Sequence, residues 1–138
     1  MRYTARMDTP LAKITDTLAR HPELMLGIVF GSTADKTSTT QSDLDVAVAG
    51  ARALSAEEKL RLIDELALDS NRAIDLVDLH ALHGPLLARL LKNGRIVLRR
   101  EGDDIYPRLI LRAIADEADF LPYRRRILES RRNAWTGN

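Results

Sequence analysis

A short, almost wholly apolar segment, Leu24–Phe30, places the strongest constraint on how this chain folds. An apolar run of this length, interrupted only by Gly27, is typical of a strand that is buried on both faces. Such a strand lies inside a sheet that other elements cover. The segment therefore predicts a sheet with helices packed against it.

The rest of the chain alternates between helical and extended patterns. Asp8 or Thr9 caps a first helix that Pro10 opens and Pro22 ends. Further strands are expected at Leu44–Val48, Ala73–Leu79 and Arg95–Arg99. Further helices are expected after the capping box of Ser55 and Glu58, from Pro85 to Gly94, and after Pro107.

Each expected helix carries an apolar stripe that we expect to face the core. The first helix has Leu11, Ile14 and Leu18, and the helix after Ser55 has Leu60, Ile63, Leu66 and Ala67. The stripe of the Pro85 helix is Leu86, Leu87, Leu90 and Leu91, and that of the last helix includes Leu111 and Ile114. The order α-β-β-α-β-α-β-α predicts an α/β (α+β) fold, with helices on a small mixed sheet. We expect a single domain over residues 1–138, with its core at about 10–98 and a C-terminal helical extension at about 106–135.

Composition excludes several kinds of protein. The chain has no cysteine, which rules out a disulfide, a thiolate nucleophile and a Cys-ligated zinc site. No apolar run approaches the ~20 residues of a membrane span, and residues 1–10 lack the apolar region of a signal peptide. We therefore expect a cytoplasmic protein that does not act at a membrane.

Charge is unevenly distributed along the chain. The net charge is +1, yet residues 106–138 carry seven Arg against four acidic residues, which is +3. A basic end suggests an acidic protein partner or nucleic acid, although charge alone favours a solvated helix face. We expect no direct binding of nucleic acid.

Three aspartates stand at unusual positions in the expected strands. Asp43 and Asp45 are two residues apart, so the period of a strand places both carboxylates on one face. Asp75 interrupts an apolar strand, where an unpaired carboxylate is costly to bury. If the two strands are neighbours, the three carboxylates repel one another unless a cation compensates. Oxygen ligands of this kind favour Mg²⁺, and two Mg²⁺ ions suit phosphoryl or nucleotidyl transfer.

A Gly-Ser pair follows the Leu24–Phe30 strand. Gly31 lets backbone amides approach a phosphate closely, and the hydroxyl of Ser32 adds a donor. A helix beginning after Ser32 would add the positive potential of its N-terminus. A phosphate cradle thus precedes the carboxylates in sequence, which is the layout that holds a nucleoside triphosphate and its metal ions.

The joint pattern is far more specific than its parts. Gly31-Ser32, a ten-residue spacer and Asp43-Leu44-Asp45 resemble the motif of the nucleotidyltransferase superfamily that includes DNA polymerase beta. The chain length and the segment Ile74–Leu79 resemble its minimal branch, the MNT-type antitoxins of HEPN/MNT toxin–antitoxin pairs.

This resemblance implies a function and a role for each motif residue. It implies an antitoxin that transfers AMP from ATP to a tyrosine hydroxyl of a HEPN ribonuclease toxin, and a hetero-oligomer with that toxin. Asp43 and Asp45 would hold two Mg²⁺ ions, and Asp75 would complete the metal site and help to deprotonate the hydroxyl. Gly31 and Ser32 would hold the β- and γ-phosphates.

The chain also departs from the family pattern. Many minimal nucleotidyltransferases carry Arg directly after Gly-Ser, whereas this chain has Thr33-Ala34-Asp35-Lys36. Lys36 is the candidate for the missing phosphate contact, although Asp35 beside it opposes a triphosphate. Asp78 is a second candidate for the third carboxylate, but it alternates to the opposite face, and the family pattern favours Asp75. An ion pair with Arg72 or Arg95 is the structural alternative for Asp75.

Two other functions remain open at this stage. A small-molecule nucleotidyltransferase of the kind that inactivates antibiotics would use the same site, although such enzymes generally need a second domain for their substrate. A non-catalytic antitoxin that neutralises its partner by binding would have no need of a self-repelling group of aspartates.

Overall fold

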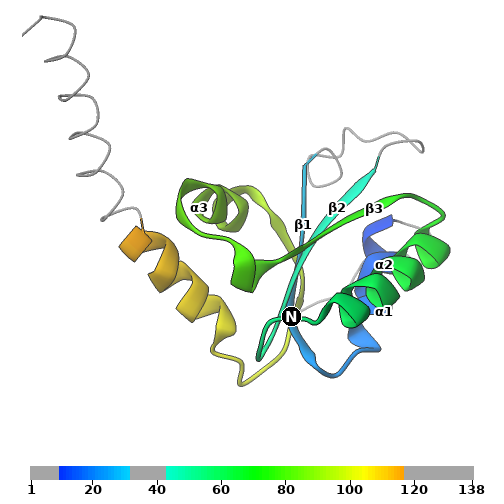
Figure 1. Cartoon of the computed structure of the whole chain (residues 1–138), viewed down its shortest axis with the longest axis horizontal. Helices are drawn as coiled ribbons and strands as arrows, with labels where there is room; N and C mark the ends of the chain where they lie inside the picture. The colour runs from blue at the N-terminus through cyan, green and yellow to red at the C-terminus, as the bar shows by residue number, and fades with distance from the viewer. Residues whose placement is uncertain (1–9, 32–42, 117–138) are drawn as a thin grey trace, which may run out of the picture.

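The structure, a computed structural model, describes residues 10–31 and 43–116. Figure 1 shows a four-stranded sheet with helices on both of its faces. The elements are α1 (Pro10–Ala19), β1 (Leu24–Phe30), β2 (Leu44–Gly50), α2 (Ala56–Ser70), β3 (Ile74–Asp78), the 3₁₀ turn η1 (Leu79–Ala81), α3 (Gly84–Asn93), β4 (Arg95–Arg99) and a helix over residues 105–116. This arrangement confirms the expected fold class.

The sheet is mixed, with strand order β3-β2-β1-β4. β1 pairs antiparallel with both β2 and β4, whereas β2 and β3 run parallel. The parallel pair requires a crossover, which α2 provides. In the described residues, no helix has both the length and the apolar character needed to cross a membrane.

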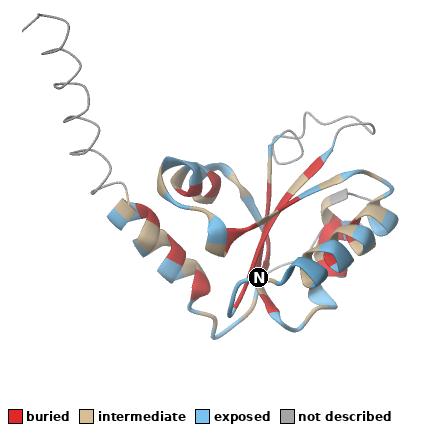
Figure 2. Ribbon diagram, in the orientation of Figure 1, coloured by how far each residue is buried: buried red, intermediate tan, exposed pale blue. Residues whose placement is uncertain are grey.

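The two faces of the sheet form two separate cores. Leu44, Val46 and Leu76 pack with Ile14 and Leu18 of α1 and with α2. On the other face, Ile28, Ala47 and Val77 pack with α3 and with the 105–116 helix. In Figure 1, α1 and α2 accordingly lie on one side of the sheet and α3 on the other, and Figure 2 shows the buried central strands. We call these the α1/α2 face and the α3 face.

Local interactions explain where several elements begin and end. The hydroxyl of Ser55 accepts a hydrogen bond from the amide of Glu58 (3.1 Å), and the Glu58 carboxylate accepts one from the amide of Ser55 (2.9 Å), so the expected capping box is present. The third strand is shorter than expected. It ends at Asp78 because the carboxylate of Asp78 accepts the amide of His80 (2.9 Å) and starts a 3₁₀ turn.

Three of the expected apolar stripes are partly wrong. On α2, Leu66 is buried as predicted, but Leu60 is 63% exposed. On α3, Leu87 and Leu90 are buried as predicted, but Leu86 is 58% exposed. The last described helix begins before Pro107, since Pro is tolerated in a first turn. Its buried stripe is Ile105, Leu109 and Ala113, spaced by four residues, while Leu111 and Ile114 are exposed. The predicted cap at Asp8 or Thr9 and most of the predicted C-terminal extension lie outside the described residues.

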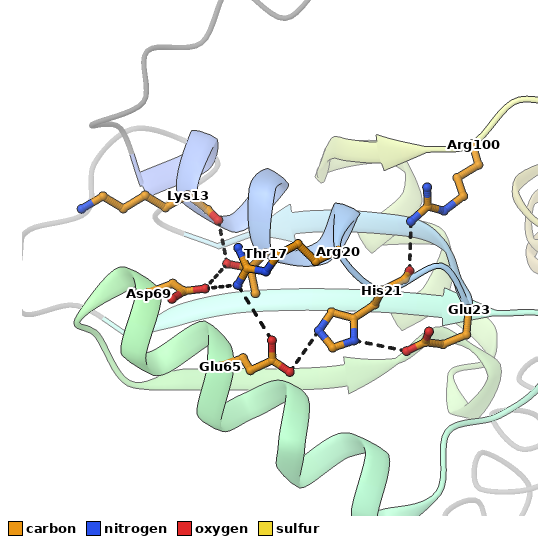
Figure 3. A network of polar contacts seen from close by, with 8 residues as sticks. All are labelled: Lys13, Thr17, Arg20, His21, Glu23, Glu65, Asp69 and Arg100. Atoms are coloured by element: carbon orange, nitrogen blue, oxygen red, sulfur yellow. Dashed lines mark hydrogen bonds and ion pairs between the residues drawn. The ribbon is translucent and has the colours of Figure 1, made fainter.

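A network of paired charges joins α1 to α2 (Figure 3), and we call it the polar corner: Thr17, Arg20, His21, Glu65 and Asp69. The carboxylate of Asp69 accepts hydrogen bonds from the buried hydroxyl of Thr17 (2.7 Å) and from Arg20 (2.6 Å). The ring of His21 lies 3.1 Å from a carboxylate oxygen of Glu65. Arg20 also lies 3.8 Å from the carboxylate of Glu65, so both acidic groups of the polar corner lie beside its guanidinium.

Arg100 fastens β4 to the turn between α1 and β1. Its Nε donates to the carbonyl of Leu24 (2.6 Å), and its Nη2 donates to the carbonyls of His21 (2.9 Å) and Ala19 (3.2 Å). The last carbonyls of a helix have no partner within it, so this guanidinium provides a donor to the carbonyl of Ala19 at the end of α1.

Candidate active site

Three side chains stand in a row across the α3 face of the sheet. Asp45 on β2 is the direct partner of Asp75 on β3 and of Phe30 on β1. Directly paired residues project to the same face of a sheet. The strands thus bring the two predicted carboxylates together at neighbouring positions, and they place an aromatic ring beside them that the sequence did not single out.

The electrostatics of Asp45 show that these carboxylates interact. Burial raises the pKa of Asp45, and so do the charge of Asp75, a hydrogen bond with the carboxyl group of Asp75 and the charge of Asp43. Asp43 is exposed and precedes β2, which begins at Leu44. We call Asp43, Asp45 and Asp75 the acidic cluster.

Gly31 closes the row at the end of β1. Its φ of +76° is a conformation that L side chains rarely adopt. A Cβ at this position would also collide with the carboxylate of Asp45. The backbone of the predicted phosphate cradle and the acidic cluster are therefore in direct proximity, and any other residue at position 31 would disturb both.

The donor set of the acidic cluster fits a hard divalent cation such as Mg²⁺. Its ligands would be carboxylate oxygens, and a cation there would offset the burial and the neighbouring negative charges that together raise the pKa of Asp45. Across residues 10–31 and 43–116, however, no group of three or more His, Cys, Asp or Glu side chains is gathered closely enough to hold a metal ion. The assignment of Asp43, Asp45 and Asp75 as metal ligands therefore stays a prediction.

Asp78, the rejected alternative for the third carboxylate, has a structural role. It is 5% exposed, and it accepts hydrogen bonds from the amides of Leu54 (2.7 Å) and His80 (2.9 Å). Those bonds hold the start of α2 and the end of β3. Arg95 lies on β4, at the opposite edge of the sheet from Asp75, and so is not its ion-pair partner. Ser32 and Lys36 lie outside the described residues.

A cavity of about 350 Å³ opens next to this site. Its lining is Phe30 and Gly31 of the β1 end, Leu86, Arg89, Leu90 and Asn93 of α3, and Gly94. Gly31 therefore lies next to the carboxylate of Asp45 and also lines the cavity. Sequence reasoning missed this cavity because it assigned Leu86 and its neighbours to the core. The signal was present in the spacing of Leu86, Arg89 and Asn93, which one helix face shares.

A Gly turn beside two facing carboxylates, on a small mixed sheet, is the geometry of a nucleotidyltransferase. Residues 12–103 match the family described as polymerase beta nucleotidyltransferase, and the chain belongs to that family. Within it, the chain is similar to the protein adenylyltransferase MntA of Shewanella oneidensis, with 31% identity over 83 residues. Those residues are 60% of this chain and 60% of the relative's length.

Solved structures show the same relationship over more of the chain. A crystal structure of a toxin–antitoxin pair with AMP-PNP matches with a TM-score of 0.72 and 26% identity, covering 87% of this chain and 96% of the other. An antitoxin from a complex with a tri-AMPylated HEPN toxin of Shewanella oneidensis shares the fold, with a TM-score of 0.68 and 24% identity over 91% of this chain and 98% of the other.

Proposed function

We propose that this chain is an antitoxin that transfers AMP from ATP to a tyrosine hydroxyl of a HEPN ribonuclease toxin and thereby neutralises it. The observation that carries the proposal is the facing pair of Asp45 and Asp75 beside the Gly31 turn. The similarity to a protein adenylyltransferase and to a chain of a toxin–antitoxin pair crystallised with AMP-PNP supports the choice of ATP and of a protein acceptor.

The proposed reaction is an in-line displacement. The tyrosine oxygen forms a bond to the α-phosphorus of ATP, the bond from that phosphorus to the bridging oxygen of the β-phosphate breaks, and pyrophosphate leaves. The proton of the hydroxyl passes to a carboxylate, for which Asp75 is our candidate. Gly31 and Ser32 hold the β- and γ-phosphates, and Lys36 is a further candidate contact. Positioning and charge neutralisation account for most of the catalysis in reactions of this type.

The acidic cluster is the proposed site for two Mg²⁺ ions, with Asp43, Asp45 and Asp75 as the ligands. When bound, Mg²⁺ supplies neutralisation of the triphosphate and of the charge that develops on the leaving group. Asp45, which is half-buried, and Asp75, which is exposed, would supply oxygen donors from neighbouring positions of the sheet, and the exposed Asp43 would add a third from just before β2.

Intact mass spectrometry of the HEPN partner tests the proposal directly. The partner is incubated with this protein, ATP and Mg²⁺, with the Asp43→Asn/Asp45→Asn protein as the control. A mass gain in whole AMP units with the native protein alone supports the proposal. A stable complex with no mass gain would instead indicate neutralisation by binding, and modification of a small hydroxylated compound would indicate the antibiotic-type activity.

A further inference from the structure

The cavity beside Gly31 carries a cation whose role the motif residues do not explain. Arg89 is exposed on α3, and it has no hydrogen bond or ion pair with any residue in the described part of the chain. An Arg on a protein surface is often solvated in this way. This one, however, lines a cavity that borders the phosphate-binding turn, where negative charge is expected to bind.

One face of α3 builds the cavity wall. Leu86, Arg89, Leu90 and Asn93 follow the spacing of three, four and seven residues that aligns side chains along a helix. Leu90 is 6% exposed and anchors the helix to the core, whereas Leu86 is 58% exposed at the opening. The helix therefore holds Arg89 on a rigid support beside Gly31.

The cavity lies at one end of the row across the α3 face of the sheet. Phe30 belongs both to the cavity and to the row, as the partner of Asp45. The order along the sheet is Asp75, Asp45, then the β1 end with Gly31, then the cavity. A triphosphate with its α-phosphate at the acidic cluster and its β-phosphate at Gly31 would direct its distal phosphates toward this cavity.

We infer that Arg89 binds the β- and γ-phosphates of the nucleotide. The inference rests on the proposed function, whose nucleotide site it completes. A guanidinium suits this task because its parallel N–H groups match the oxygens of a phosphate.

The end of α3 presents one opposing interaction. The C-terminus of a helix carries about half a negative charge, which disfavours a phosphate. Here the amide of Gly94 already donates to the carbonyl of Leu90 (2.8 Å), which reduces the exposed negative potential. The full positive charge of Arg89 is larger than the partial negative charge at the C-terminus of α3. Arg95 is excluded from the same role, since it pairs with Val29 and projects to the α1/α2 face.

The test compares the binding of AMP-PNP and of AMP to the full chain, by calorimetry with Mg²⁺ present. Arg89→Gln is expected to weaken the binding of AMP-PNP by roughly tenfold or more, the loss typical of a charged hydrogen bond. It should leave the affinity for AMP within about twofold, because AMP lacks the distal phosphates. Arg89→Lys should retain part of the AMP-PNP affinity, because it keeps the charge.

Arg95→Gln is the matched control, with the same change of charge on the opposite face. Equal losses for AMP and AMP-PNP in Arg89→Gln would overturn the inference, because Arg89 would then contact the nucleoside or the α-phosphate, which both ligands share. Unchanged AMP-PNP binding, or an equal loss in Arg95→Gln, would also overturn it. If the native protein binds AMP-PNP in this Arg89-dependent way but adds no mass to the HEPN toxin, the proposed function fails while the inference stands.

Discussion

The polar corner and the acidic cluster lie on opposite faces of the sheet and shift the pKa values of their aspartates in opposite directions. In the polar corner, the hydrogen bond from Thr17 and then the contact with Arg20 lower the pKa of Asp69. In the acidic cluster, burial and the neighbouring carboxylates raise the pKa of Asp45. One face thus uses its charges to join helices, whereas the other keeps like charges together at a cost in stability. A site that carries such a cost is expected to bind a cation or to perform chemistry.

The largest effect should come from removing the acidic cluster. Asp43→Asn with Asp45→Asn is expected to lower the rate of AMP transfer by roughly a thousandfold or more, since electrostatic stabilisation dominates in sites of this type. The initial rate of mass gain on the HEPN toxin measures this loss. Circular dichroism and a melting curve should show an intact fold. A collapsed fold would mean that these aspartates are structural and would remove the contrast between the two faces.

The largest effect on stability should come from the α1/α2 face. Arg100→Met keeps the apolar stem but removes the donors to three carbonyl groups. It is expected to lower the free energy of unfolding by about 2–3 kcal/mol, measured by urea denaturation. Arg99→Met is the control, because Arg99 is exposed and, within residues 10–31 and 43–116, makes only a cation–π contact with Tyr106, at 4.7 Å, worth about 0.5–1 kcal/mol. Similar losses for the two variants would contradict the role given to Arg100.

The sequence was sufficient to predict the strands and the carboxylates, for physical reasons. Strand periodicity placed Asp45 and Asp75 opposite to their apolar neighbours, and the structure makes them direct partners. The capping box and the Gly94 helix end were local patterns that need no tertiary information. Short-range rules of this kind hold because the interactions lie within one turn or one strand.

The cavity and the buried stripes could not be predicted, because they depend on packing between distant elements. Leu86 is as apolar as Leu87, and only the position of α3 against the sheet decides which of them is buried. The role of Arg100 has the same origin, since its three acceptors lie more than 70 residues away in sequence. Nothing in the local sequence of Arg100 distinguishes it from Arg99.

A single substitution at Asp45 should show the cost of the acidic cluster. Asp45→Asn is expected to raise the melting temperature at neutral pH, on the order of 3 °C, because it removes a charge that burial and Asp75 disfavour. Because the pKa of Asp45 is raised in the folded protein, its ionisation lowers the free energy of unfolding of the native protein as the pH rises above the usual aspartate pKa. The advantage of the variant should therefore grow with pH from about 4.

Mg²⁺ sharpens this prediction. A cation that binds the folded acidic cluster raises the melting temperature of the native protein and has less effect on Asp45→Asn. The difference in melting temperature between the native protein and Asp45→Asn should therefore become smaller as Mg²⁺ is added. A native melting temperature that does not respond to Mg²⁺, with a variant less stable than the native protein, would show that the cluster is held by structural interactions.

The smallest effect is expected at Asp69, and its sign is opposite to that expected at Asp45. Asp69→Asn should lower the melting temperature at neutral pH by on the order of 1–2 °C, since the carboxylate is exposed and solvent screens its contact with Arg20. A lowered pKa means that the native carboxylate stabilises the fold above the usual aspartate pKa and loses this contribution as the pH falls through its own. Melting curves from pH 7 to pH 3 should therefore show the melting temperature of Asp69→Asn below that of the native protein at neutral pH, and the two values should converge at acid pH. The melting temperature of Asp45→Asn should instead approach the native value from above. If both variants instead shifted in the same direction at neutral pH, net charge and not the local partners would control these two aspartates.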